Sequence, residues 1–221
     1  MTGRYTFDFG AVWEYRGLLA FGLVVSLALL ALALVCGLFL GLLAGMGRLS
    51  RFRLISLPSA LYIEMFRGTP ALIQLFWFYY AFPILFHIKI PAFPTGVLSL
   101  SLFTGAYVGE IVRGGIQSVH KGQMLAARAL GLSYLDAMRE IILPQAVRRM
   151  LPPLISQSVD VFKATALAST ITVPELMYQT YYATSQTFRF VEFYTLSALV
   201  YFVISFPLIS YVRRLELHVG V

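Results

Sequence analysis

Charged side chains are scarce in this sequence. Asp, Glu, Lys and Arg make up 12% of its 221 residues, whereas hydrophobic residues make up 59%. A soluble domain typically has about a quarter of its residues charged and about half apolar. The mean hydropathy of +0.79 departs from that norm in the same direction. The composition therefore excludes an ordinary soluble domain and indicates an integral membrane protein.

Cysteine is also nearly absent. Cys36 is the single cysteine, so the sequence can build neither a disulfide framework nor a cysteine-based zinc site. Because Cys36 lies inside an apolar run, we expect it to be a small buried side chain. The sequence holds no G-x-x-x-x-G-K-[ST] loop and therefore cannot grip nucleotide phosphates in the P-loop manner. We expect no catalytic residue, metal site or cofactor on this chain.

The net charge of +7 raises the question of a nucleic-acid partner. The basic residues, however, flank apolar stretches and form no patch in which arginine and aromatic residues alternate. We therefore expect no nucleic acid to bind. The lipid bilayer is the expected environment instead.

Five apolar stretches are long enough to cross a bilayer, which requires about 20 residues. The first is too long for the core of a signal peptide, so we expect it to be retained. The sequence predicts one all-α transmembrane domain over residues 1–221, with about five helices. The expected spans are residues 17–46, 55–82, 95–112, 150–173 and 193–212.

Lys and Arg follow the first, third and fifth spans, whereas the other two connections hold few of them. Because basic residues accumulate on the cytoplasmic side, this pattern predicts an external N-terminus and a cytoplasmic C-terminus. We expect a multi-pass protein of the inner (plasma) membrane. The basic residues concerned are Arg48, Arg51 and Arg53, then Lys121, Arg128, Arg139, Arg148 and Arg149, and finally Arg213 and Arg214.

Glycine and proline mark several positions along the spans. Gly37, Gly41 and Gly45 recur every fourth residue, a spacing that lets two helices approach closely. Residues 67–70 read Arg-Gly-Thr-Pro and predict a kink or two half-helices, because proline removes a helical hydrogen bond. Pro152-Pro153 is expected to open the fourth span, where a missing N–H costs least.

Residues 121–144, here called the elbow, form a charged insert between the third and fourth spans. Lys121–Leu130 consists of strong helix formers and precedes Gly131, a good left-handed cap. Ser133 stands three residues before Asp136, as in a capping box, and Pro144 is expected to end the second helix. One interpretation is an amphipathic helix on the inner leaflet, and the other is a docking site for a cytosolic partner. The expected apolar stripe is Leu135, Met138, Ile141 and Ile142.

The elbow carries a resemblance to a known family. Ala126-Ala127, Gly131 and Ile141-Ile142-Leu143-Pro144 stand at the spacings of the Glu-Ala-Ala signature of ABC importer permeases, although Leu125 replaces the usual glutamate. Three further segments, FRGTPALIQLFWFYY, GAYVGEIVRGGIQSVHKGQ and KATALAS, are similar to segments of amino acid permeases. The sequence thus resembles the membrane-spanning subunit of a type I ABC importer of the polar amino acid uptake group.

The resemblance implies several partners. The elbow would be the coupling helix that sits in a groove of a separate ATP-binding cassette subunit, which would hold ATP and Mg. A second permease, of the same or a sister chain, and an extracytoplasmic substrate-binding protein would complete the transporter. The residues implied in coupling are Leu125, Ala126, Ala127, Arg128, Gly131 and Leu132.

Ionisable residues within the expected spans are costly and usually face a cavity or a partner. Glu64 with Arg67 and Glu110 with Arg113 stand three apart, which suggests mutual pairing on a helix. Glu64 is also a candidate substrate-binding residue. Arg67, or a half-helix that starts near Thr69, is a candidate site for a substrate carboxylate.

Asp160 stands ten residues after Met150, about 15 Å along a helix and therefore near mid-membrane. Lys163 is its simplest partner. The alternative is that Asp160 and Gln157 face a central pocket and receive a cationic group of the substrate. Both interpretations stay open at this stage.

These observations predict the pore subunit of an ATP-driven importer for polar amino acids, with a basic or zwitterionic substrate favoured by the intramembrane carboxylate. A permease for a compatible solute such as ectoine is the alternative within the same group. An ion-coupled carrier that works alone is less favoured, because no inverted repeat is visible and the elbow would have no role.

Overall fold

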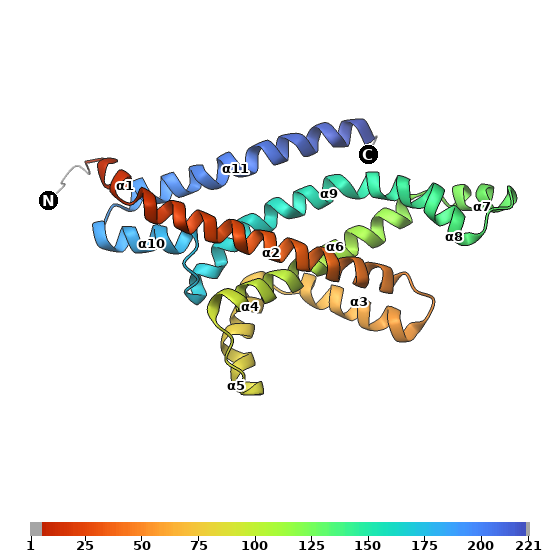
Figure 1. Cartoon of the computed structure of the whole chain (residues 1–221), viewed down its shortest axis with the longest axis horizontal. Helices are drawn as coiled ribbons and strands as arrows, with labels where there is room; N and C mark the ends of the chain where they lie inside the picture. The colour runs from red at the N-terminus through yellow and green to blue at the C-terminus, as the bar shows by residue number, and fades with distance from the viewer. Residues whose placement is uncertain (1–5, 220–221) are drawn as a thin grey trace.

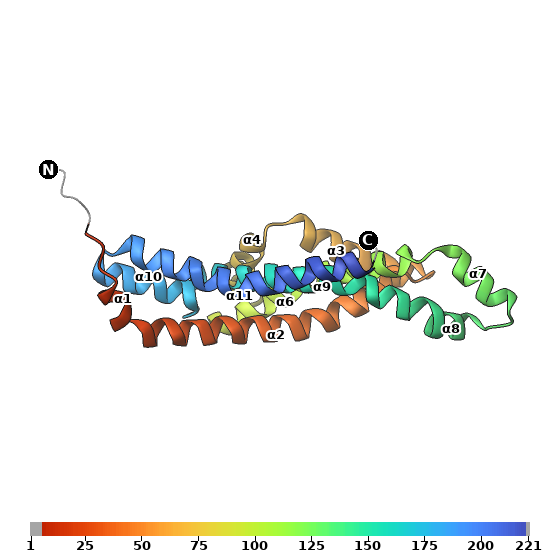
Figure 2. The same ribbon diagram turned by 90° about the horizontal axis from the view of Figure 1, so that it is seen from above.

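The computed structural model describes the backbone of residues 6–219 and the side chains of residues 6–215. Every regular element in this part of the chain is a helix, which confirms the expected all-α class. Four long helices run roughly along the long axis of the molecule (Figures 1 and 2). They are α2 (Arg16–Arg48), α6 (Ala92–Ser118), α9 (Leu143–Ala164) and α11 (Phe190–Val219).

Shorter helices complete the fold at the two ends and on one side. Helices α1 and α10 lie at one end of the molecule, and α7 and α8 of the elbow lie at the other, whereas α5 projects sideways (Figure 1). The shorter elements are α1 (Gly10–Glu14), α3 (Arg53–Gly68), α4 (Ala71–Phe76), the π-helix η1 (Trp77–Ala81), α5 (Phe82–Phe86), α7 (Lys121–Ala129), α8 (Tyr134–Ala137), the π-helix η2 (Met138–Ile142), the 3₁₀-helix η3 (Thr165–Ile171) and α10 (Leu176–Thr187).

Three helices among the described residues are long and apolar enough to cross a membrane, namely α2, α6 and residues 190–215 of α11. The helices over residues 53–68 and 71–86 form a fourth candidate, bent by 106° at the break between them. The expected span over residues 150–173 coincides with α9 and η3, which are not among these candidates. Arg148, Arg149, Asp160 and Lys163 lower the hydropathy of α9, so a crossing there remains a prediction.

Helix α2 packs against α6 through the predicted glycine stripe, and all three of its glycines are buried. A Cβ atom on Gly37 would lie 2.6 Å from Thr104, and one on Gly41 would lie 2.5 Å from Val108. Only glycine permits this approach, so the predicted packing role is confirmed. The prediction that Cys36 is buried is wrong, because this residue lies off the glycine stripe and is exposed.

The start of α9 differs from the prediction. The helix continues directly from η2 and begins at Leu143, so Pro144 lies in its first turn instead of ending the elbow. Pro152 and Pro153 therefore lie inside the helix and not at its start. Pro144 lies in the first turn of α9, directly after the π-helix η2, whereas Pro152 and Pro153 each remove a hydrogen bond inside the helix. Burial of Met150 against α6 keeps the helix in place beyond that turn.

Candidate functional site

The elbow is built by two capping motifs that the sequence predicted. Gly131 has φ of +85° and follows the last turn of α7. Its N–H donates to the carbonyl of Arg128, and the N–H of Leu132 donates to that of Ala127, which together form a Schellman motif. Ser133 then caps α8 by accepting from the N–H of Asp136 at 3.2 Å. The helix–glycine–helix geometry is therefore confirmed.

The elbow exposes several large apolar side chains at the end of the molecule. Leu125, Leu130, Tyr134 and Leu135 are all largely exposed. Of the predicted apolar stripe, Ile142 is buried and Met138 and Ile141 pack beside it, whereas Leu135 stays exposed. Exposed apolar clusters of this kind mark interaction surfaces. Arg128 and Ala126 are exposed beside them.

Ala127 is buried, whereas the neighbouring Ala126 is exposed. The Ala127 side chain is 1% exposed, because α7 folds back on α8 and η2 at this point. A small side chain is needed inside the elbow itself. Ala127 therefore shapes the elbow from within, whereas Ala126 is open to a partner.

The predicted break at residues 67–70 is present and is stabilised by side chains. Thr69 and Pro70 adopt extended backbone conformations between α3 and α4, as expected for proline and the residue before it. The Thr69 hydroxyl donates to the Met65 carbonyl at 2.9 Å. The Gln74 amide donates to the Phe66 carbonyl at 2.7 Å and to Thr69 Oγ1 at 2.8 Å. These bonds satisfy carbonyls that the break leaves free.

A cavity of about 380 Å³ lies beside this break. Gln74 is nearly buried, and its Oε1 atom has no hydrogen-bond partner among the described residues. A buried acceptor in this state can receive a donor from a bound molecule. Sequence reasoning missed Gln74, although a polar residue in the apolar run after a proline break was the available signal. The lining residues are Met65, Phe66, Thr69, Ile73, Gln74, Trp77 and Phe78.

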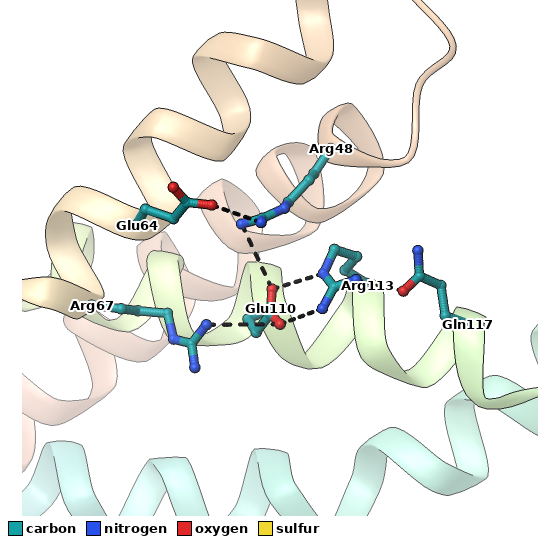
Figure 3. Close-up of polar contacts among 6 residues, drawn as sticks. All are labelled: Arg48, Glu64, Arg67, Glu110, Arg113 and Gln117. Atoms are coloured by element: carbon teal, nitrogen blue, oxygen red, sulfur yellow. Dashed lines mark hydrogen bonds and ion pairs between the residues drawn. The ribbon is translucent and has the colours of Figure 1, made fainter.

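Arg48 of α2, Glu64 and Arg67 of α3, and Glu110 and Arg113 of α6 form a charge cluster (Figure 3). The pairing predicted for Glu64 with Arg67 is wrong, because Glu64 instead binds Arg48 of α2 at 2.8 Å. The pairing of Glu110 with Arg113 is confirmed, with Nε donating at 2.8 Å. Glu110 also lies 3.8 Å from Arg67 and 3.9 Å from Arg48. Helix packing thus overrides the local i,i+3 spacing of Glu64 and Arg67.

Asp160 and Lys163 form an ion pair at 3.3 Å, with side chains 64% and 52% exposed. Gln157, one turn earlier, is nearly buried, and its Nε2 atom has no hydrogen-bond partner in the part of the chain that the structure describes. The predicted pairing of Asp160 with Lys163 is therefore present. Within this chain the structure does not bring Asp160 and Gln157 together, since one faces outward and the other inward.

A buried acid that sequence reasoning missed lies near the opposite end of the molecule. Glu175 is fully buried and caps α10 by accepting from the Tyr178 N–H at 2.8 Å. Ser26 of α2 and Tyr201 of α11 each donate to its other oxygen at 3.1 Å. Glu175 thus joins three helices through its carboxylate. The residue lies in a connection between expected spans, which is why its burial was not foreseen.

Among the described residues, no group of three or more His, Cys, Asp or Glu side chains is placed to hold a metal ion. Residues 37–220 match a family model described as the inner membrane component of binding-protein-dependent transport systems. The glutamine transport system permease protein GlnP of Escherichia coli is 38% identical over 211 residues, which cover 95% of this chain and 96% of that protein.

Two further similarities support the same assignment. The arginine transport system permease protein ArtQ of Bacillus subtilis is 32% identical over 197 residues, covering 89% of this chain and 90% of that protein. A chain from a crystal structure of an amino acid ABC transporter with histidines superposes with a TM-score of 0.91 at 37% identity, over 97% of this chain and 100% of that chain. The first two relatives are named as permease proteins of transport systems. The chain belongs to the family of inner membrane components of binding-protein-dependent transport systems.

Proposed function

We propose that this chain is the translocation subunit of an ATP-driven importer for polar amino acids. The observation that carries the proposal is the similarity over nearly the full chain to permeases named for glutamine and arginine transport. The elbow, with its exposed apolar side chains, supports a role in a larger assembly. The ectoine alternative is not favoured, because the relatives described above carry amino acid names.

The elbow is the proposed contact with a separate ATP-binding cassette subunit. Leu125, Ala126 and Arg128 lie exposed on α7, and Gly131 and Leu132 set the turn that follows. Leu125 occupies the position where the family signature has glutamate, so an apolar contact takes the place of an ion pair there. ATP and Mg bind the partner subunit, since this sequence has no P-loop.

A second permease, of the same or a sister chain, is the proposed partner that completes the pathway. Asp160 supports this proposal because its carboxylate is directed away from the body of its own chain and is largely exposed. A charged residue in a membrane domain is stable when it faces a partner or an aqueous cavity. An extracytoplasmic binding protein delivers the substrate, with the N-terminus outside and the C-terminus in the cytoplasm.

The proposed substrate is a basic or zwitterionic amino acid. Asp160 receives its positive group, and Arg67 its carboxylate. Arg67 supports this role because its side chain is 39% exposed and its ion pair with Glu110 is long, at 3.8 Å. Gln157 and Glu64 are further proposed substrate contacts, whereas Thr69 contributes by holding the helix break open beside the cavity.

Reconstitution tests the proposed function. The chain is purified with its candidate ATPase and binding-protein partners and placed in proteoliposomes. Uptake of labelled glutamine, arginine, histidine and ectoine is measured with and without internal ATP. We expect ATP-dependent uptake of at least one amino acid. Ectoine uptake alone, or uptake driven by an ion gradient without ATP, would contradict the proposal.

A further inference from the structure

The corner between α2 and α3 holds a basic cavity that the proposed transport pathway does not use. This corner cavity has a volume of about 490 Å³. It lies where α2, the most apolar candidate span, ends at Arg48, and therefore where the chain leaves the hydrocarbon for water. Its lining residues are Arg48, Arg53, Ser56, Leu57 and Ala60.

The corner cavity is lined by two arginine side chains, and one of them has no acidic partner among the described residues. Arg48 is already bound to Glu64 at 2.8 Å (Figure 3). Arg53, in contrast, forms no ion pair or side-chain hydrogen bond with the described residues, and the Ser56 hydroxyl has no partner there either. The cavity therefore offers a guanidinium and a hydroxyl to an anion. Phosphate oxygens match such donors well.

An apolar stripe on α3 starts at the wall of this cavity. Leu54, Leu57 and Leu61 are 92%, 71% and 66% exposed, and Met65 continues the series at 52%. Their spacing of three or four residues puts them on one face of the helix. Leu57 belongs both to this stripe and to the cavity lining. A bound molecule could thus meet a basic cavity and a hydrocarbon surface at once.

We propose that the corner cavity binds the headgroup of an anionic phospholipid, with the phosphate against Arg53 and Ser56 and an acyl chain along the α3 stripe. Basic pockets between helices at the cytoplasmic interface suit anionic headgroups. The apolar stripe distinguishes a lipid from free phosphate, because free phosphate has no hydrocarbon chain to pack against it. The site is separate from the elbow and from Asp160.

The test measures lipid retention by the full-length chain in detergent, using native mass spectrometry and titration with phosphatidylglycerol. Arg53→Gln removes the unpaired charge, and we expect binding to weaken about ten- to a hundredfold, as for loss of a charge-assisted hydrogen bond. Arg51→Gln is the matched control, because Arg51 stacks on Phe52 and does not line the cavity. Arg51→Gln should change the affinity for phosphatidylglycerol by less than about twofold. Phosphatidylcholine should bind the unmodified chain more weakly than phosphatidylglycerol does.

A second arm separates a lipid from soluble phosphate. Leu57→Ser should weaken binding of phosphatidylglycerol but not of glycerol phosphate, because only the lipid uses the stripe. Equal losses in Arg53→Gln and Arg51→Gln would overturn the proposal, as would no loss in either. Glycerol phosphate binding as tightly as the lipid would assign the cavity to a soluble anion instead. Gel filtration of each variant checks that the fold is retained.

Discussion

Asp160 and Lys163 form a largely exposed ion pair on α9. Such a pair contributes only about 0–1 kcal/mol to stability, so Asp160→Asn should leave the transporter assembled. If the carboxylate receives the substrate's positive group, the same change removes a bond of about 1.5–3 kcal/mol. We expect uptake of a basic or zwitterionic amino acid to fall about ten- to a hundredfold, measured together with co-purification of the ATPase.

The double variant Asp160→Asn, Lys163→Met provides the control for this prediction. Removal of both charges relieves the unpaired lysine. Uptake that recovers in the double variant would assign Asp160 to Lys163 alone. A stable complex that still fails to transport would support contact with the substrate.

The i,i+3 spacing of charged residues predicted only some of the ion pairs that form. The i,i+3 pairs Glu110–Arg113 and Asp160–Lys163 form as expected, because both partners lie on one helix with no nearer competitor. Glu64 has such a competitor in Arg48, which the end of α2 brings to 2.8 Å. The Glu64 side chain is 66% exposed, so it reorients at little cost.

At the scale of the element, the turn at Gly131 determines the shape of the elbow. Its φ of +85° is unfavourable for residues with a Cβ atom, yet the space around it is open. Gly131→Ala should therefore destabilise the turn by about 1 kcal/mol through the backbone alone. We expect faster hydrogen exchange at the amides of Gly131 and Leu132, and weaker coupling of ATP hydrolysis to transport.

Gly131→Asn is the matched substitution, because asparagine tolerates the left-handed conformation better than alanine does. In this variant the hydrogen-exchange rates of the amides at positions 131 and 132 should stay closer to those of the wild type. Gly131→Arg should go further and block docking of the ATPase through bulk and charge. If the ATPase still co-purifies with that variant and hydrolyses ATP in response to substrate, the elbow is not the coupling site.

The contact between α2 and α6 provides the second prediction for an element. Gly41→Leu would place a side chain where Val108 already lies within 2.5 Å of a Cβ position. Overpacking of this kind costs about 1–3 kcal/mol or more, so the melting temperature in detergent should fall. Gly17→Leu lies on the same helix with no atom within 4 Å, and an equal effect there would contradict the packing role.

At the scale of the whole molecule, α1 and the elbow lie at opposite ends (Figure 1). We predict that the first end is external and the second cytoplasmic. Cysteines introduced singly at Phe7 and Lys89 should react with an impermeant reagent from outside, and one at Ser133 only from inside. Cys36 must first be replaced by serine, because it is exposed on α2. External labelling at Ser133 would contradict both the topology and the coupling role.

Features that depend on neighbours along the chain could be predicted from the sequence. These are the long apolar helices α2, α6 and α11, the helix break at Thr69-Pro70, the glycine stripe and the caps at Gly131 and Ser133. Each follows from the local conformational preference of one or two residues, or from a period of apolar or small side chains. The family resemblance also depends on such local motifs and can therefore be recognised from the sequence.

Contacts between side chains on different helices depend on the tertiary structure. Examples are the switch of Glu64 to Arg48, the three-helix contact at Glu175 and the exposure of Cys36. No periodicity encodes these contacts, because they result from how whole helices pack against one another. The same packing leaves Arg53 without an ion pair or side-chain hydrogen bond among the described residues and leaves Asp160 largely exposed on the surface of its chain.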